Sequence, residues 1–261
     1  MPRFAANLSM MFTEVPLLER FERAARAGFK AVELQFPYEV TAAEMVARLK
    51  GAGLQMVLHN LPAGDAAKGE RGIACDPART AEFREGVERA IAYATALDVP
   101  RLNCLAGIPP ADVDEPTRRR TFVANIRHAA AALKAAGKEL VVEPINTFDV
   151  PGFWLNRTAQ ALELLDEVGA DNAFVQYDLY HAQRMEGELC GTLSRHLPRI
   201  GHVQVADNPG RHEPGTGEVN WAHVLGHLDR IGYTGWVGCE YKPAGLTEDG
   251  LGWMKAFTQP G

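Results

Sequence analysis

The sequence predicts an α/β fold, a closed (β/α)₈ barrel that forms a single domain over residues 1–261. Short β-rich apolar runs alternate with longer stretches whose apolar residues recur at helical spacing, and eight such units can be counted. No linker or low-complexity segment divides them, and barrels of this kind are about 250 residues long. An open doubly wound sheet shares the alternation. The phosphate-binding glycine motifs of the commonest open sheets are missing, which favours the barrel.

Eight strands are expected, with a helix fitting between each pair. The expected strands are residues 4–8, 31–35, 55–59, 101–104, 140–143, 173–178, 200–205 and 235–240.

Local signals mark where helices begin and end. Thr41 and Glu44 have the spacing of a capping box, Asp76 precedes a proline that favours the first helical turn, and Asn220 can cap the helix that follows it. Glycines that each follow a periodic segment are expected to end helices in the left-handed conformation. These are Gly28, Gly137, Gly169 and Gly232.

Composition narrows the class of protein. The chain has 46% hydrophobic residues and a formal charge of −6, with no apolar run long enough to span a membrane and no basic stripe for nucleic acid. Its four cysteines are scattered without a CxxC pair, and the N-terminus lacks the features of a secretory signal. A cytoplasmic enzyme with neither a nucleic-acid nor a membrane partner is expected. Whether it is a monomer or a homo-oligomer is left open.

Polar residues close four consecutive predicted strands. Apolar runs end in or lead to Glu143, Asp178, Gln204 and Glu240, each about one βα unit after the last. Catalytic groups of a barrel lie at the C-terminal ends of its strands, so these side chains are expected to meet. His202, two residues before Gln204, faces the same side of its strand and is expected to be a buried structural partner.

Three carboxylates that converge in a partly desolvated barrel mouth repel one another unless a cation or bound protons offset their charge. One divalent metal ion held by Glu143, Asp178, Gln204 and Glu240 is the economical answer. Because the ligands are oxygens without a thiolate, Mg²⁺ or Mn²⁺ is favoured over Zn²⁺. The alternative for each residue is a structural role, capping a helix or pairing with an arginine.

Two glutamates at separated points of the rim suit a reaction that moves a proton between adjacent carbons. Glu143 and Glu240 can serve as acid and base if their surroundings tune their pKa values. The metal ion would polarise a carbonyl and stabilise the enediolate that forms when a neighbouring C–H proton leaves. The expected substrate is a small hydroxy-oxo acid.

Such a substrate also needs hydrogen-bond donors and positive charge. His181 follows the sixth strand and is a candidate donor to a substrate oxygen, and His59 closes the third. Arg211, on a Gly/Pro-rich loop after the seventh strand, is the first candidate for the carboxylate. Lys68 and Arg71, on a long loop after the third strand, could clamp it as part of a lid. For each of these residues except Arg211, the alternative is a purely structural role or a side chain that is simply exposed to solvent.

Several stretches make the chain resemble the hydroxypyruvate isomerase family, within the xylose isomerase-like barrels. The resemblance runs nearly end to end and is carried by ANLSM, LHNLPAGD, GERGIAC, EPIN, DLYH and GCEYKP. It implies interconversion of hydroxypyruvate and tartronate semialdehyde, with Glu143 and Glu240 as proton donor and acceptor, and with Asp178 and Gln204 completing the metal ligands. Ala66 departs from the aromatic residue expected after the Gly-Asp pair, which puts the packing of the lid in question.

Three other activities compete. A 2-oxo-tetronate isomerase of the same branch would use the same residues on a substrate one carbon longer. A ketose 3-epimerase commonly has a histidine where this chain has Gln204. A DNA-repair endonuclease with this barrel would need a histidine-rich set of zinc ligands, and the chain offers Gln204 and a net negative charge instead. The isomerase is the favoured hypothesis.

Overall fold

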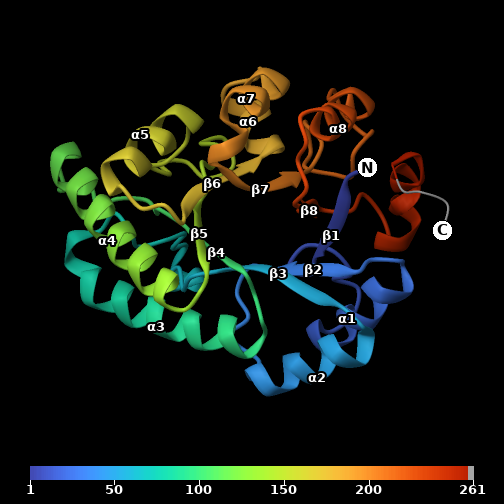
Figure 1. Ribbon diagram of the computed structural model, residues 1–261, viewed down its shortest axis with the longest axis horizontal. Coiled ribbons are helices and arrows are strands. Elements are labelled where there is room, and N and C mark those ends of the chain that lie inside the picture. Colours follow the sequence, from blue (N-terminus) through green and yellow to red (C-terminus); the bar gives the residue numbers. More distant parts are fainter. Residues whose placement is uncertain (258–261) are drawn as a thin grey trace.

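Eight parallel strands close into a barrel in the order in which they occur along the chain, and β1 pairs with β8 to complete the ring (Figure 1). The fold class predicted from the sequence is confirmed. The computed structural model describes residues 1–257, so the last four residues of the predicted domain lie outside the described residues. The strands are β1 Arg3–Asn7, β2 Ala31–Leu34, β3 Gln55–Asn60, β4 Arg101–Cys104, β5 Glu139–Val142, β6 Ala173–Asp178, β7 Ile200–Val205 and β8 Trp236–Cys239.

Helices surround the strands, as Figure 1 shows, and bury their apolar faces against the sheet. The α-helices are α1 Leu17–Arg26, α2 Ala42–Ala52, α3 Thr80–Ala96, α4 Glu115–Ala135, α5 Thr158–Val168, α6 Leu179–Met185, α7 Leu189–His196 and α8 Trp221–Arg230. Short 3₁₀ helices are η1 Ala66–Lys68, η2 Pro77–Arg79, η3 Leu197–Arg199 and η4 Thr247–Ala256. No helix within residues 1–257 combines the length and the apolar character needed to cross a membrane.

The predicted helix signals have the expected geometry, with one difference. Thr41 and Glu44 form the capping box of α2, and the Asn220 side chain accepts a hydrogen bond from the third backbone amide of α8. All four predicted stop glycines have positive φ. Asp76, however, caps the short helix η2, and α3 begins only at Thr80. The Asp-Pro signal therefore marks a 3₁₀ turn that leads into the helix.

The barrel interior changes from apolar to polar along the strands. Ala5, Ala31 and Val141 belong to a small buried apolar cluster. Side chains two residues apart on a strand share a face. Asn7, Glu33 and Glu143 therefore follow these three residues on the inner face, one layer closer to the C-terminal ends of the strands. Because strands β5 and β8 end one residue earlier than predicted, Glu143 and Glu240 lie just beyond them, at the opening we call the mouth.

Candidate active site

Four buried side chains meet at the mouth. Glu143, Asp178, His181 and Glu240 each present a possible ligand atom, and these atoms lie within 4.8 Å of one another. They come from the end of β5, the end of β6, the first turn of α6 and the end of β8. We call them the carboxylate–histidine cluster. The parallel strands deliver the three acids because they all end at the same rim.

Asp178 is both the last residue of β6 and the N-cap of α6. Its Oδ1 accepts a hydrogen bond of 2.8 Å from the backbone amide of Tyr180. Its Oδ2 is buried without a hydrogen-bond partner within the described residues. The cap therefore fixes the carboxylate and leaves one oxygen facing the cluster.

The two glutamates are held by amide side chains of neighbouring strands. Asn103 donates to Glu143 Oε2 at 2.8 Å, and Glu143 Oε1 is buried without a hydrogen-bond partner among the described residues. Asn7 and Gln35 donate to Glu240 Oε1 at 3.0 and 2.8 Å. These donors fix the positions of both carboxylates, so little rearrangement is needed to use them.

The hydrogen bonds of His181 determine which of its nitrogens carries the proton. Its Nδ1 lies 2.6 Å from the Asn146 side-chain amide, whose own oxygen is used by the backbone amides of Phe148 and Asp149. Because Asn146 thus presents its N–H groups, Nδ1 is an acceptor and the proton of the neutral ring is on Nε2. Nε2 lies 3.6 Å from Asp178 Oδ2 and 3.8 Å from Glu143 Oε1. His181 is therefore arranged as a donor toward the cluster rather than as a metal ligand.

The pKa values of these groups follow from their burial. Burial raises the pKa of Glu143 well above its ordinary value, and the charges of Glu240 and Asp178 add to the effect. Burial likewise raises the pKa of Asp178, and it raises the pKa of Glu240 to about 7 although Arg211 opposes the rise. Burial, with help from Arg211, lowers the pKa of His181 well below its usual range. The cluster thus combines a neutral histidine with carboxyls that bind protons tightly.

Arg211 supplies the positive charge next to the cluster. Its guanidinium lies 2.6 Å from Glu240 Oε2 and 3.6 Å from Asp178 Oδ2, and it packs 5.3 Å from the centre of the Tyr180 ring. The side chain is only 18% exposed. The sequence suggested a residue on a flexible loop, whereas the structure holds Arg211 against two of the predicted metal ligands.

The residues present fit a divalent cation. Two buried carboxylate oxygens, Glu143 Oε1 and Asp178 Oδ2, have no hydrogen-bond partner in the described part of the chain. Three buried acids face one arginine, so a second positive charge would relieve the repulsion that raises their pKa values. The chemistry of the donors and their spacing therefore both suit a metal ion.

Gln204, the fourth predicted ligand, lies on β7 in a buried hydrogen-bond network. Its Oε1 accepts from Gln176 at 2.6 Å, and its Nε2 donates to Glu33 Oε1 at 2.7 Å. A carboxylate only accepts hydrogen bonds, so Glu33 fixes which end of the Gln204 amide is the oxygen. Gln204 is therefore oriented by a neighbour that the sequence did not single out.

Glu33 is the centre of this network. It is fully buried, and besides Gln204 it accepts from Asn7 at 2.9 Å and from His202 Nε2 at 2.7 Å. The structural role predicted for His202 is thus confirmed. The carboxylate of Glu33 also lies directly against the backbone of β8, where a Cβ at Gly238 would come within 2.3 Å of its Oε2. The position needs glycine for space.

The remaining predicted substrate ligands are not brought to the cluster. His59 is buried, and its Nδ1 lies 3.0 Å from the backbone oxygen of Asn60. Lys68 is exposed and lies 3.3 Å from Asp65, while Arg71 is exposed and donates to the backbone oxygen of Glu70. The loop that carries Lys68 and Arg71 is held by local contacts of this kind, and its Glu70 also pairs with Arg79 at 2.8 Å.

Several residues of the site were missed from the sequence. Glu33, Gln176, Asn7 and Asn103 are polar residues inside buried strands, and that misfit with a buried position was the available signal. Asn146 follows Glu143 by only three residues and lies in the EPIN stretch. Only the fold, which joins distant strands, shows which of these side chains touch.

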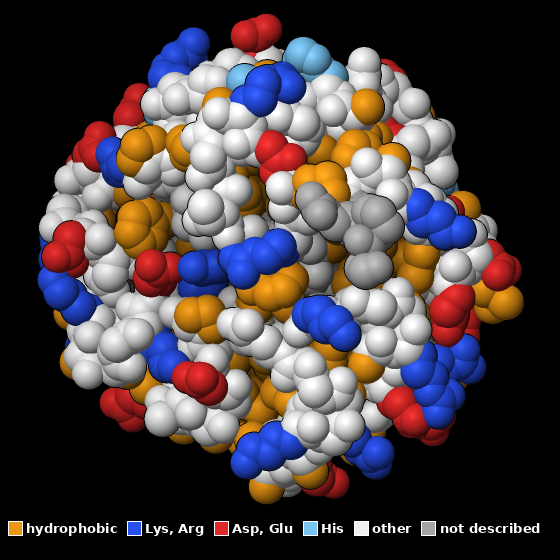
Figure 2. Space-filling view, turned by 45° about the vertical axis from the view of Figure 1, so that its right-hand side comes forward, with side chains coloured by type: hydrophobic (Ala, Val, Ile, Leu, Met, Phe, Trp, Pro, Cys, Tyr) orange, Lys and Arg blue, Asp and Glu red, His pale blue; other side chains and the backbone are white. Residues whose placement is uncertain are grey.

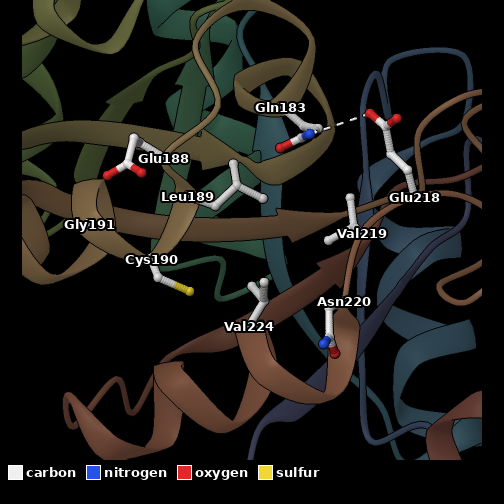
Figure 3. Close-up of a pocket in the computed structure, with 9 residues that line it drawn as sticks. All are labelled: Gln183, Glu188, Leu189, Cys190, Gly191, Glu218, Val219, Asn220 and Val224. Carbon is white, nitrogen blue, oxygen red and sulfur yellow. Dashed lines mark hydrogen bonds between the residues drawn. The ribbon is translucent and has the colours of Figure 1, made fainter.

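Of the cavities that residues 1–257 form, two with room for a small molecule border helix α6. One, of about 280 Å³, lies between α6, α7 and the start of α8, away from the cluster, and is lined by the apolar side chains of Leu189 and Val224 beside acidic Glu188 and Glu218 (Figure 3). The other, of about 360 Å³, adjoins the cluster. It is lined by Asp149, Val150, Tyr180, Arg184, Gly210, Arg211 and Lys242, and we call it the basic cavity.

The metal-free protein is expected to become less stable to heat as pH rises from about 5 to about 8. Glu240 has a pKa of about 7 in the folded state against an ordinary value of 4.5. A carboxyl with a raised folded-state pKa stabilises the fold below its unfolded pKa, and this contribution is lost as pH rises through the folded value. Melting curves with chelator across this range test the prediction.

The variant Glu240→Gln is the control, because it removes the titrating group and should flatten the decline. Addition of Mg²⁺ at the upper end of the range should restore stability to the unmodified protein. A decline of the same size in the variant would assign the effect to other groups.

Comparisons with known proteins agree with the barrel. Residues 21–257 match a family model described as xylose isomerase-like TIM barrel. The chain is 52% identical over 257 residues to a hydroxypyruvate isomerase of Escherichia coli strain K12, which covers 98% of this chain and 100% of that protein. It is 48% identical over 257 residues to a 2-oxo-tetronate isomerase of Cupriavidus necator, with 98% of this chain and 99% of that protein covered.

A solved structure is also similar over the full length. The crystal structure described as AP endonuclease, family 2, from Brucella melitensis has a TM-score of 0.96 to this chain. The two are 46% identical, and the match covers 99% of this chain and all of the other.

Proposed function

Because this chain belongs to the xylose isomerase-like TIM barrel family, and within it to the hydroxypyruvate isomerase family, we propose that it interconverts hydroxypyruvate and tartronate semialdehyde. The chain is an isomerase, as its close relatives are. One observation carries the proposal: Glu143 and Glu240 meet in one buried cluster. Asp178 lies in the same cluster, next to one charged and one neutral hydrogen-bond donor. Two glutamates in such a place suit proton transfer at adjacent carbons.

The proposal includes one divalent ion held by Glu143, Asp178, Gln204 and Glu240. Support comes from the two unpartnered carboxylate oxygens and from the spacing of the cluster. Oxygen ligands favour Mg²⁺ or Mn²⁺ over Zn²⁺, and the tautomer of His181 keeps its nitrogen lone pair away from the cluster. When bound, the ion would polarise the substrate carbonyl and so make the neighbouring C–H more acidic.

The chain's own residues then move the proton. One glutamate takes it from the carbon that bears the hydroxyl, and the other returns a proton to the neighbouring carbon that carried the carbonyl. The hydroxyl proton passes to the former carbonyl oxygen, so the two groups exchange places. Asn103 holds Glu143 through Oε2 and leaves Oε1 without a hydrogen-bond partner among the described residues, so the carboxylate is fixed and still open on one side. Burial raises the pKa values of both glutamates toward neutrality, where an acid and a base work best at physiological pH.

His181 and Arg211 position the substrate in this scheme. The Nε2–H of His181 points toward the cluster and would donate to a substrate oxygen, while burial keeps the ring neutral. Arg211 would orient Glu240 and face the charge that develops on the substrate. Both roles need these side chains to stay buried, because water would compete for the same hydrogen bonds.

Metal-dependent turnover is the expected result of the direct assay. The protein is treated with chelator, given Mg²⁺, Mn²⁺ or Zn²⁺, and supplied with hydroxypyruvate, while a coupled reductase follows tartronate semialdehyde. We expect activity to return with Mg²⁺ or Mn²⁺ and to be lost again with excess chelator. Full turnover by the chelated protein would remove the metal from the mechanism.

The second candidate substrate is 2-oxo-tetronate, favoured by the 48% identity to the Cupriavidus necator isomerase. The same residues would act on it, and the basic cavity beside the cluster has space for an additional carbon. Turnover of both acids measured side by side under the same conditions decides between them, because the true substrate should show the higher kcat/KM.

An endonuclease activity is a further alternative, raised by the description of the Brucella melitensis structure. The cluster offers three carboxylates and one histidine, which does not suit the histidine-rich zinc set that such a nuclease needs. On the face shown in Figure 2, basic and acidic side chains are interspersed rather than gathered into a stripe. Nicking of duplex DNA that contains an abasic site would reverse this assignment.

A further inference from the structure

The basic cavity contains three positively charged side chains beside the cluster. Arg184, Arg211 and Lys242 line it together with Tyr180 and Asp149. It adjoins the cluster because Arg211, which forms part of its wall, also contacts Glu240 at 2.6 Å. A substrate carbon skeleton bound at the cluster would therefore direct one end into this cavity.

Two of the three cations already have acidic partners. Arg184 lies 2.5 Å from Asp149 Oδ1, and Arg211 lies 2.6 Å from Glu240 Oε2. The Lys242 side chain has no ion pair within residues 1–257. Of the three, Lys242 is the cation whose charge is available to an incoming anion.

The backbone places Lys242 on the same side as Glu240. Tyr241, between them, is fully buried and packs its ring edge-on toward Trp253, on the helix side of the strand. Lys242, three residues after the end of β8, is exposed and lines the basic cavity. Its amide donates to the backbone oxygen of Arg211 at 2.7 Å, and its own oxygen lies 2.7 Å from His212 Nδ1.

We propose that the Lys242 ammonium, in the basic cavity beside Arg184 and Arg211, forms the subsite that receives the carboxylate of the substrate. This inference rests on the proposed function, because it assigns the acid group of the same small hydroxy-oxo acid. Arg211, named from the sequence for this task, is held by Glu240 and Asp178 and is left to orient the reacting end. Lys68 and Arg71, also named from the sequence as a clamp, contact residues of their own loop.

The test compares an acid with its neutral counterpart. In dihydroxyacetone a hydroxymethyl group replaces the carboxylate of hydroxypyruvate, while the carbonyl and the neighbouring C–H remain. Losing one charge-assisted hydrogen bond should lower kcat/KM for hydroxypyruvate about tenfold to a hundredfold in Lys242→Met, mainly through KM. We expect dihydroxyacetone, which lacks the carboxylate, to be turned over slowly and at the same rate in Lys242→Met, and Lys242→Arg should recover most of the loss on hydroxypyruvate.

The variant Lys134→Met is the matched control, because Lys134 is an exposed lysine that pairs with Asp171 on the outer side of the barrel. It should leave both substrates unaffected. An equal loss on both substrates in Lys242→Met, or no loss on either, overturns the proposal while leaving the isomerase assignment in place.

Binding of D-glycerate tests the carboxylate subsite without requiring turnover. It therefore shows whether the subsite exists even if the proposed function is wrong. Glycerate carries the carboxylate but no carbonyl, so it cannot be isomerised, and its affinity for the Mg²⁺-supplemented protein is measured by calorimetry. Weaker binding in Lys242→Met than in Lys134→Met supports the subsite even if hydroxypyruvate proves not to be a substrate. Equal affinity in the two variants contradicts it.

Discussion

Replacing Glu143 or Glu240 by glutamine is expected to lower the isomerisation rate by about 10² to 10⁴, the range over which a positioned acid or base accelerates proton transfer. Glutamine keeps the shape and the oxygen of each side chain but cannot exchange a proton. Both carboxylates are buried and anchored by amide donors, which hold them in position for the transfer. Turnover of hydroxypyruvate, measured with saturating Mg²⁺, checks the prediction.

Two further measurements make the result decisive. Circular dichroism and the melting temperature establish that each variant is folded, and a titration with Mn²⁺ establishes whether it still binds the ion. A folded, metal-binding variant with full activity would exclude its glutamate from the proton-transfer step. A variant that has lost the ion must be retested at higher metal concentration before its kcat is interpreted.

Replacing Glu33 by alanine is expected to destabilise the fold by about 3–5 kcal/mol, because it leaves buried hydrogen-bond donors without their acceptor. His202, Gln204 and Asn7 all donate to this carboxylate from strands β7 and β1. Asn7 also holds Glu240, so activity should fall as well. The free energy of unfolding, measured by denaturant titration, gives the first effect, and kcat of the folded fraction gives the second.

Two further variants serve as comparisons for the loss of stability expected in Glu33→Ala. Glu33→Gln keeps the size of the side chain but turns one acceptor into a donor that faces another donor, so a loss of about 1–3 kcal/mol is expected. Glu39→Gln makes the same chemical change on an exposed side chain and should alter stability by less than about 0.5 kcal/mol. Equal stability of the Glu33 and Glu39 variants would show that the network contributes little.

The fold and the strand-end acids could be predicted from the sequence because both depend on short-range patterns. The alternation of strands and helices predicted the bounds of all eight strands to within about two residues. In a parallel barrel the acids at the ends of the apolar runs must lie at the same rim. Glu143, Asp178 and Glu240 are close in space for this reason alone.

The contacts that tune these acids could not be predicted, because they join residues far apart in the sequence. The tautomer of His181 depends on Asn146, and the pairing of Arg211 depends on how the loop after β7 folds back over β8. That the loop with Lys68 forms a lid stays a prediction; Asp65 and Glu70 bond this loop locally, which length and composition do not reveal. The positions of the strand-end acids were therefore more predictable than the contacts of the loops.

The absence of a side chain at Gly238 limits how this barrel can vary. The space that a methyl group would fill is taken by the carboxylate of Glu33, which comes from the second strand of the chain, while Gly238 belongs to the last. A mutation at position 33 or position 238 alone is expected to disturb the packing between them. Close packing could be preserved only by two substitutions together, a small residue at 33 and a larger one at 238. We therefore expect a side chain at position 238 only where position 33 no longer carries the acid.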